Sequence, residues 1–181
     1  MTTGQIILMT GFYLALFVAV AYFTRAKLRR ILGALAAGAV FGLVALPALA
    51  LGEAQGWWHL PQEGSSHFQL LLWLAFAISS GPTYLILWRV VRRFGGRGLA
   101  VCIVVSTIIG PPRDYWIAAT FPAWMTFAPG IAPVLADATL YALLVIVGHA
   151  VMRLVVGPAQ EDSLALRLSD AEKNGPSGNP P

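Results

Sequence analysis

Five long apolar segments constrain the fold of this chain more than any other feature of its sequence. They cover roughly residues 4–23, 31–52, 68–88, 98–120 and 131–152. Each approaches or exceeds the ~20 residues that an α-helix needs to cross the core of a bilayer. Only 11% of the residues are charged, whereas soluble domains carry about a quarter. The sequence therefore predicts an all-α, polytopic integral membrane protein, a bundle of five transmembrane helices.

The basic residues predict how this bundle is oriented in the membrane. Eleven of the 12 Lys and Arg residues lie between the first and second segments, between the third and fourth, or after the fifth: Arg25, Lys27, Arg29, Arg30, Arg89, Arg92, Arg93, Arg97, Arg153, Arg167 and Lys173. If five segments span the membrane, these residues share one side, which the positive-inside rule assigns to the cytoplasm. We therefore expect the N-terminus outside and the C-terminus inside, in a cell membrane of the bacterial inner-membrane type.

The same distribution bears on the partners of the protein. A net charge of +4 is compatible with nucleic-acid binding, but short basic clusters between apolar segments reflect membrane topology rather than a phosphate-binding face. We therefore expect no nucleic-acid partner. Residues 1–156 are predicted to form the transmembrane domain, and the polar residues 157–181, which include four prolines, a flexible cytoplasmic tail.

The twelfth basic residue, Arg113, lies inside the fourth apolar segment, where residues 110–116 read GPPRDYW. Two adjacent prolines remove two backbone donors from a helix, and two opposite charges follow directly. We therefore predict that the fourth helix is broken at Pro111-Pro112. Two alternatives remain open: a kinked helix that continues to Thr120, or a helix that stops and leaves 111–130 as a re-entrant or interfacial segment.

A second ionisable residue, Asp137, is predicted to lie at the same depth as Arg113. Arg113 follows Arg97 by sixteen residues, and Asp137 precedes Arg153 by sixteen. At 1.5 Å per residue, both lie about 24 Å above the inner boundary of the membrane core. Because the fourth and fifth segments are consecutive and antiparallel, we expect a salt bridge between Arg113 and Asp137. The adjacent residues Arg113 and Asp114 point about 100° apart on a helix, so we do not expect them to pair.

These charges define a predicted polar layer near the outer leaflet, and ionisable residues within a membrane are functional by default. The candidate ligand-binding residues are Arg113, Asp114, Tyr115, Asp137, Tyr141 and Glu53. One interpretation is an Arg113–Asp137 salt bridge that only fixes two helices. The other is a pocket for a small or lipophilic ligand. The second acid, Asp114, favours the pocket, because it is left over to carry a proton or to bind a cationic headgroup.

Two further patterns have a structural and a functional interpretation. Residues 79–84 (SSGPTY) interrupt the third segment and predict a kink, which either packs in the bundle or lines a ligand site; we favour packing. In the loop from 52 to 67, His59, Glu63 and His67 recur every four residues. Pro61 and Gly64 disfavour a helix there, so the spacing has no geometric meaning and we predict no metal site.

The sequence contains no glycine-rich phosphate loop and no Gly-x-Ser-x-Gly motif, and it predicts no cofactor. We favour a non-enzymatic membrane protein that binds or passes a small or lipophilic ligand. One alternative is an integral-membrane enzyme acting on a lipid-soluble substrate, with Asp114 or Asp137 as acid or base and Arg113 holding an anion. Another is an accessory subunit whose charged layer pairs with a helix of a partner. Besides the lipid bilayer, the expected partners are a lipophilic ligand, a second copy or a partner membrane subunit.

Overall fold

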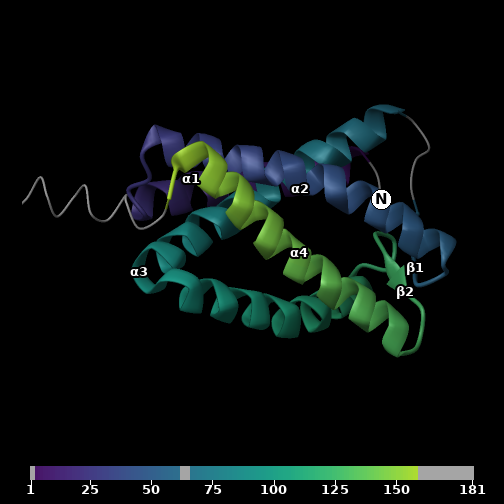
Figure 1. Cartoon of the computed structure of the whole chain (residues 1–181). Helices are drawn as coiled ribbons and strands as arrows, with labels where there is room; N and C mark the ends of the chain where they lie inside the picture. Colours follow the sequence, from purple (N-terminus) through teal and green to yellow (C-terminus); the bar gives the residue numbers. More distant parts are fainter. Residues whose placement is uncertain (1–2, 62–65, 159–181) are drawn as a thin grey trace, which may run out of the picture.

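The computed structural model describes residues 3–61 and 66–158 and is mostly helical. The described helices are α1 (Thr3–Phe23), α2 (Leu28–Ala54), α3 (Ser66–Thr120) and α4 (Ile131–Val156) (Figure 1). All four are long and apolar enough to cross a membrane. Two short strands, β1 (Trp58–His59) and β2 (Thr126–Phe127), pair antiparallel. The predicted flexible tail lies outside the described residues, apart from its first two positions.

Helix α3 contains a sharp reversal at Gly95, which has a φ of 61° and a ψ of −144°. Residues 66–94 and 96–120 therefore form two limbs, and the second folds back from the first (Figure 1). Glycine suits this position because it adopts a positive φ at little steric cost. The sequence predicted five separate helices, whereas the described residues contain four, because the third and fourth predicted segments are the two limbs of α3.

The second limb of α3 continues through Pro111 and Pro112 and ends at Thr120. The predicted break at Pro111-Pro112 is therefore wrong, and of the two alternatives the structure has the helix that continues to Thr120 rather than a separate segment over 111–130. Residues 121–130 contain β2. The fixed φ of proline is compatible with a helix, although each proline removes a backbone donor and places its ring against the carbonyl four residues earlier. Membrane helices tolerate such losses where neighbouring groups compensate for the freed carbonyls.

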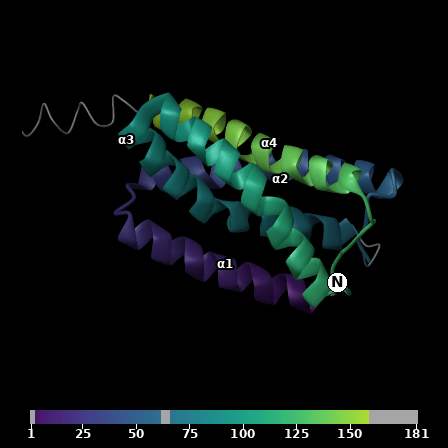
Figure 2. The ribbon, with the colours of Figure 1, turned by 90° about the horizontal axis from the view of Figure 1, so that it is seen from below.

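Small residues allow α2, α3 and α4 to approach one another closely. A methyl group added at Gly148 of α4 would overlap the ring of Tyr84, which belongs to the first limb of α3. The hydroxyl of Tyr84 donates a hydrogen bond of 3.2 Å to the carbonyl oxygen of Leu144. Such close contacts are a common way for helices to associate in a membrane. Helix α1 lies at the edge of the bundle (Figure 2), and its buried side chains are Ile6 and Phe17.

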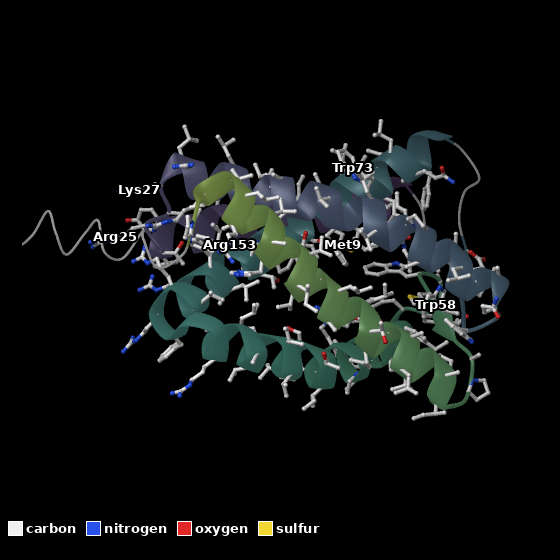
Figure 3. The ribbon with its side chains drawn as sticks, in the orientation of Figure 1. Met9, Arg25, Lys27, Trp58, Trp73 and Arg153 are labelled. Carbon is white, nitrogen blue, oxygen red and sulfur yellow. The ribbon has the colours of Figure 1, made fainter. Side chains whose placement is uncertain are left out.

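The two ends of the bundle differ in chemistry. Arg25 and Lys27, between α1 and α2, lie at the same end as Arg153 of α4, and Trp58 lies toward the other end (Figure 3). At the basic end, Nε of Arg29 donates a 2.9 Å hydrogen bond to the carbonyl oxygen of Val155. The reversal of α3 is at this end too (Figure 1). The bundle thus has a basic end and, opposite it, an end that carries the paired strands.

Candidate functional site

A cavity of about 530 Å³ lies between the helices. All four described helices contribute to it, and both limbs of α3 do. Its walls are largely apolar and include Leu16, Phe41, Phe76, Val105, Leu140 and Leu144. The volume falls within the range of roughly 300–1,000 Å³ that is typical of small-molecule sites. The cavity is therefore large enough for a ligand and apolar enough to favour a lipophilic one.

The paired strands border this cavity at the end opposite the basic residues. Leu60, which follows β1, and Met125, which precedes β2, both line it. Trp58 anchors β1 to α2, because its Nε1 donates a 2.9 Å hydrogen bond to the carbonyl oxygen of Leu49. Phe127 anchors β2 to α3, because its ring stacks on Tyr115 with centroids 4.1 Å apart. Hence the segments that carry Leu60 and Met125 are held against two helices.

Three polar side chains form a hydrogen-bonded cluster in the cavity wall. Arg113 donates to Oδ1 of Asp114 from Nε at 2.9 Å and from Nη2 at 2.7 Å. Nη2 of Arg113 also donates to the hydroxyl of Tyr141. That hydroxyl in turn donates to Oδ2 of Asp114 at 2.8 Å. Both oxygens of Asp114 are therefore occupied within the protein.

Gly110 explains how Tyr141 of α4 reaches this cluster. A methyl group added at Gly110 would overlap the Tyr141 ring, so the glycine creates the space in which the ring lies. The ring also lies near the guanidinium of Arg113, whose Cζ is 5.4 Å from the ring centroid. Gly110 thus allows Tyr141 of α4 to contact Arg113 and Asp114 of α3.

The predicted salt bridge between Arg113 and Asp137 is wrong. Arg113 forms its ion pair with Asp114, and within the described residues no ion pair or hydrogen bond joins it to Asp137. The 100° separation of adjacent helical positions applies to the Cα–Cβ bonds, but the long arginine side chain bends back to its neighbour. The side chain of Arg113 is 53% exposed and that of Asp114 is 24% exposed, so the pair lies at the edge of the bundle.

Asp137 is the buried acid of the site. It lines the cavity and is only 5% exposed. Its Oδ2 has no hydrogen-bond partner among the described residues. Arg113 and Asp114 are near enough to interact with its charge, although neither bonds to it. Buried polar atoms in folded proteins nearly always have a partner, so Asp137, which lines the cavity and has an unpartnered oxygen among the described residues, is the candidate residue for recognising a ligand.

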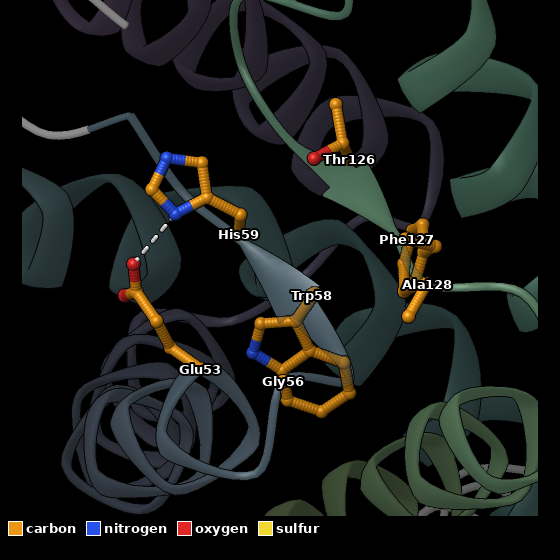
Figure 4. Close-up of a pocket in the computed structure, with 7 residues that line it drawn as sticks. All are labelled: Glu53, Gly56, Trp58, His59, Thr126, Phe127 and Ala128. Atoms are coloured by element: carbon orange, nitrogen blue, oxygen red, sulfur yellow. Dashed lines mark hydrogen bonds and ion pairs between the residues drawn. The ribbon is translucent and has the colours of Figure 1, made fainter.

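Two of the predicted site residues lie outside this cavity. Glu53 borders a smaller hollow of about 340 Å³ beside the strands, where its Oε1 is 3.0 Å from Nδ1 of His59 (Figure 4). Tyr115 stacks on Phe127 and interacts electrostatically with Asp137, but it does not line the cavity. The structure thus brings together Arg113, Asp114, Asp137 and Tyr141 in the cavity wall, whereas Glu53 and Tyr115 do not line the cavity.

The described residues contain no group of three or more side chains that could hold a metal ion. Of the three loop residues with four-residue spacing, His59 pairs with Glu53. Glu63 and the side chain of His67 lie outside what the structure describes.

The hydroxyl groups of the cavity were not identified as site residues from the sequence. Ser79, Ser80 and Thr83 line it together with Pro82, so the motif at 79–84 faces the cavity and the packing interpretation that we favoured is incomplete. Ser80 donates a 2.6 Å hydrogen bond to the carbonyl oxygen of Phe76, four residues earlier in the same helix. The feature of the sequence that could have identified them is the group of polar residues that interrupts this apolar segment.

Tyr13 and Ser106 also line the cavity. In the sequence Tyr13 has apolar neighbours, and Ser106 and Thr107 are two adjacent polar residues within an apolar run. Comparisons with protein families, with characterised proteins and with solved structures find no match for this chain. Its function must therefore be argued from the cavity itself.

Proposed function

We propose that this protein binds, or lets pass, a small lipophilic molecule in the cavity between its membrane-spanning helices. The observation that carries the proposal is the position of Asp137. Its carboxylate is buried at the wall of a largely apolar cavity, with one oxygen unpartnered among the described residues. Apolar walls with a few convergent polar groups are typical of small-molecule sites. A molecule with an apolar body and one polar group matches this arrangement.

The proposal includes a topology with five membrane crossings, in which each limb of α3 crosses once. At 1.5 Å per residue, the limbs 66–94 and 96–120 are each about 37 Å long or longer, which exceeds a core of about 30 Å. The basic residues at the α1–α2 connection and at the end of α4 support a cytoplasmic location for that end (Figure 3). The N-terminus is then outside, in a cell membrane of the bacterial inner-membrane type.

This topology places the polar cluster toward the outer leaflet. Arg113 lies seven residues before the end of α3, and Asp137 six residues after the start of α4. Both are therefore about 10 Å from the helix ends that carry the paired strands. Ligands from the outer leaflet or from outside the cell are closer to this cluster than ligands from the cytoplasm.

The proposal is tested by identifying what co-purifies with the protein. Small molecules are extracted from the purified protein and quantified by mass spectrometry, for the wild type and two variants. Ala45→Phe fills the cavity, because Ala45 lines it. Val40→Phe is the matched control on the same helix, because Val40 is exposed and does not line the cavity.

We expect one lipophilic compound in a near-stoichiometric amount in the wild type and in Val40→Phe. In Ala45→Phe its amount should fall about tenfold or more, with thermal unfolding confirming that the variant is folded. Equal amounts in all three proteins would contradict the proposal, because the compound would then bind at the lipid-facing surface.

A further inference from the structure

The charges that line the cavity do not cancel. Among the described residues that line it, Arg113 is the basic group, and Asp114 and Asp137 are the acidic groups. Arg113 gives its Nε and Nη2 donors to Oδ1 of Asp114. The hydroxyl of Tyr141 donates a hydrogen bond to Oδ2 of Asp114. These three side chains therefore bond to one another, and among the described residues no direct partner compensates the charge of Asp137.

We infer that the molecule bound in the cavity is a cationic amphiphile, with a protonated amine that donates to the carboxylate of Asp137. This inference rests on the proposed function and names the chemical class of its ligand. An ionised carboxylate only accepts hydrogen bonds, so the missing partner is a donor. A charged donor forms a shorter and stronger hydrogen bond to a carboxylate than a neutral one does.

The surroundings of Asp137 favour a cation over other polar groups. Asp114 lies close enough to interact with the charge of Asp137, so an anionic group placed there would meet two carboxylates. The guanidinium of Arg113 offsets one of them and is already bound to Asp114. Apolar side chains such as Leu140 and Leu144, one and two turns further along α4, line the adjacent wall. An alkyl or aromatic body attached to the amine would lie against them.

The test compares three probes that share one tail: dodecylamine, dodecanol and dodecanoic acid. Each is titrated against the full-length protein in nanodiscs of zwitterionic lipid at neutral pH, and the 1:1 complexes are counted by native mass spectrometry. We expect a Kd for dodecylamine at least about tenfold lower than that for dodecanol, because a charge-assisted hydrogen bond contributes at least that much. Dodecanoic acid should bind most weakly.

Two variants locate the effect. Asp137→Asn keeps the size of the side chain, removes its charge and should abolish the preference for the amine while dodecanol still binds. Glu53→Gln removes an acid near the same end of the bundle that does not line the cavity, and it should keep the preference. The wild-type selectivity among the three probes needs no variant, so it tests the inference even if Asp137→Asn fails to fold.

The outcomes separate this inference from the proposed function. Equal, saturable binding of dodecylamine and dodecanol, lost in Ala45→Phe, would overturn the cationic class and leave the lipophile site intact. Preferential binding of dodecanoic acid would also overturn it and would assign recognition to Arg113. Binding of none of the probes would overturn the inference as well, and the co-purification experiment would then decide the proposed function on its own.

Discussion

The hydroxyl of Tyr141 donates a 2.8 Å hydrogen bond to Oδ2 of Asp114. The two residues belong to different elements, α4 and the second limb of α3, so this bond connects them across the cavity wall. Because the same hydroxyl accepts a hydrogen bond from Arg113, it orients both charged side chains. A tyrosine, rather than a second carboxylate, thus joins the two helices at the polar cluster.

Replacing Tyr141 with phenylalanine should weaken this connection and leave the packing of the ring intact. We expect the free energy of unfolding in detergent to fall by about 1 kcal/mol, the size of an interhelical hydrogen bond in a membrane protein. Reversible denaturation in mixed micelles measures the change. Tyr22→Phe is the control, because Tyr22 is 78% exposed on α1 and its replacement should change stability little. An equal effect of the two substitutions would contradict a specific role for the Tyr141 hydroxyl.

The ion pair of Arg113 should be detectable as an energetic coupling with Asp114. In a double-mutant cycle of Arg113→Ala and Asp114→Ala, we expect a coupling energy of about 1 kcal/mol, because the groups are in direct contact. The corresponding cycle with Asp137→Ala should give a smaller value, because no direct bond links Arg113 to Asp137 among the described residues. A larger coupling to Asp137 than to Asp114 would restore the salt bridge expected from the sequence.

Gly110 should be more sensitive to substitution than an open glycine. Gly110→Ala places a methyl group where the Tyr141 ring lies, and overpacking of this kind destabilises by about 1–3 kcal/mol. It should also weaken ligand retention, because Tyr141 lines the cavity. Gly11→Ala on α1 is the matched control, because an added methyl group there would meet nothing within 4 Å. Thermal unfolding and quantification of the co-purified compound measure the two effects, and equal stability of both variants would contradict the packing described here.

The proposed topology predicts which positions react with membrane-impermeant thiol reagents. In a Cys102→Ala background, Gln55→Cys, next to the paired strands, should be labelled from outside the cell. Gly96→Cys, beside the reversal of α3, should be labelled only after the membrane is opened. Both positions are exposed in the structure. Labelling of position 96 in intact cells would reverse the orientation and place the cavity toward the cytoplasm.

The long apolar helices were predictable from the sequence, because each of its apolar segments is long enough to cross a bilayer as a helix. The separation of the basic residues from Trp58 was also implied by the order of clusters and apolar segments. The number of separate helices was not predictable, because the chain reverses at a single residue, Gly95, and the two limbs on either side form one helix, α3. The prediction of a helix break at Pro111-Pro112 was wrong because proline holds φ at a value that a helix also adopts, so a helix can continue through it.

Within the site, the composition of the polar layer was easier to predict than its pairing. Counting residues along helices brought Arg113 and Asp137 to one depth, and both line one cavity. The expected salt bridge between them is absent from the described part of the chain, because equal depth in the bundle determines neither the direction in which a side chain points nor how far it reaches. The contact between Gly110 and Tyr141 depends on how α3 and α4 pack, and no local pattern in the sequence predicts it.

The reversal at Gly95 also has a consequence for how the chain is inserted during synthesis. A single non-helical residue between the two limbs leaves no loop that would allow the first limb to settle in the bilayer long before the second. Under the proposed topology, Arg92, Arg93 and Arg97 stay on the cytoplasmic side while the limbs enter together as a helical hairpin. Truncation of nascent chains shortly after residue 95 should therefore leave the first limb poorly integrated, whereas chains that include residue 120 should be integrated fully.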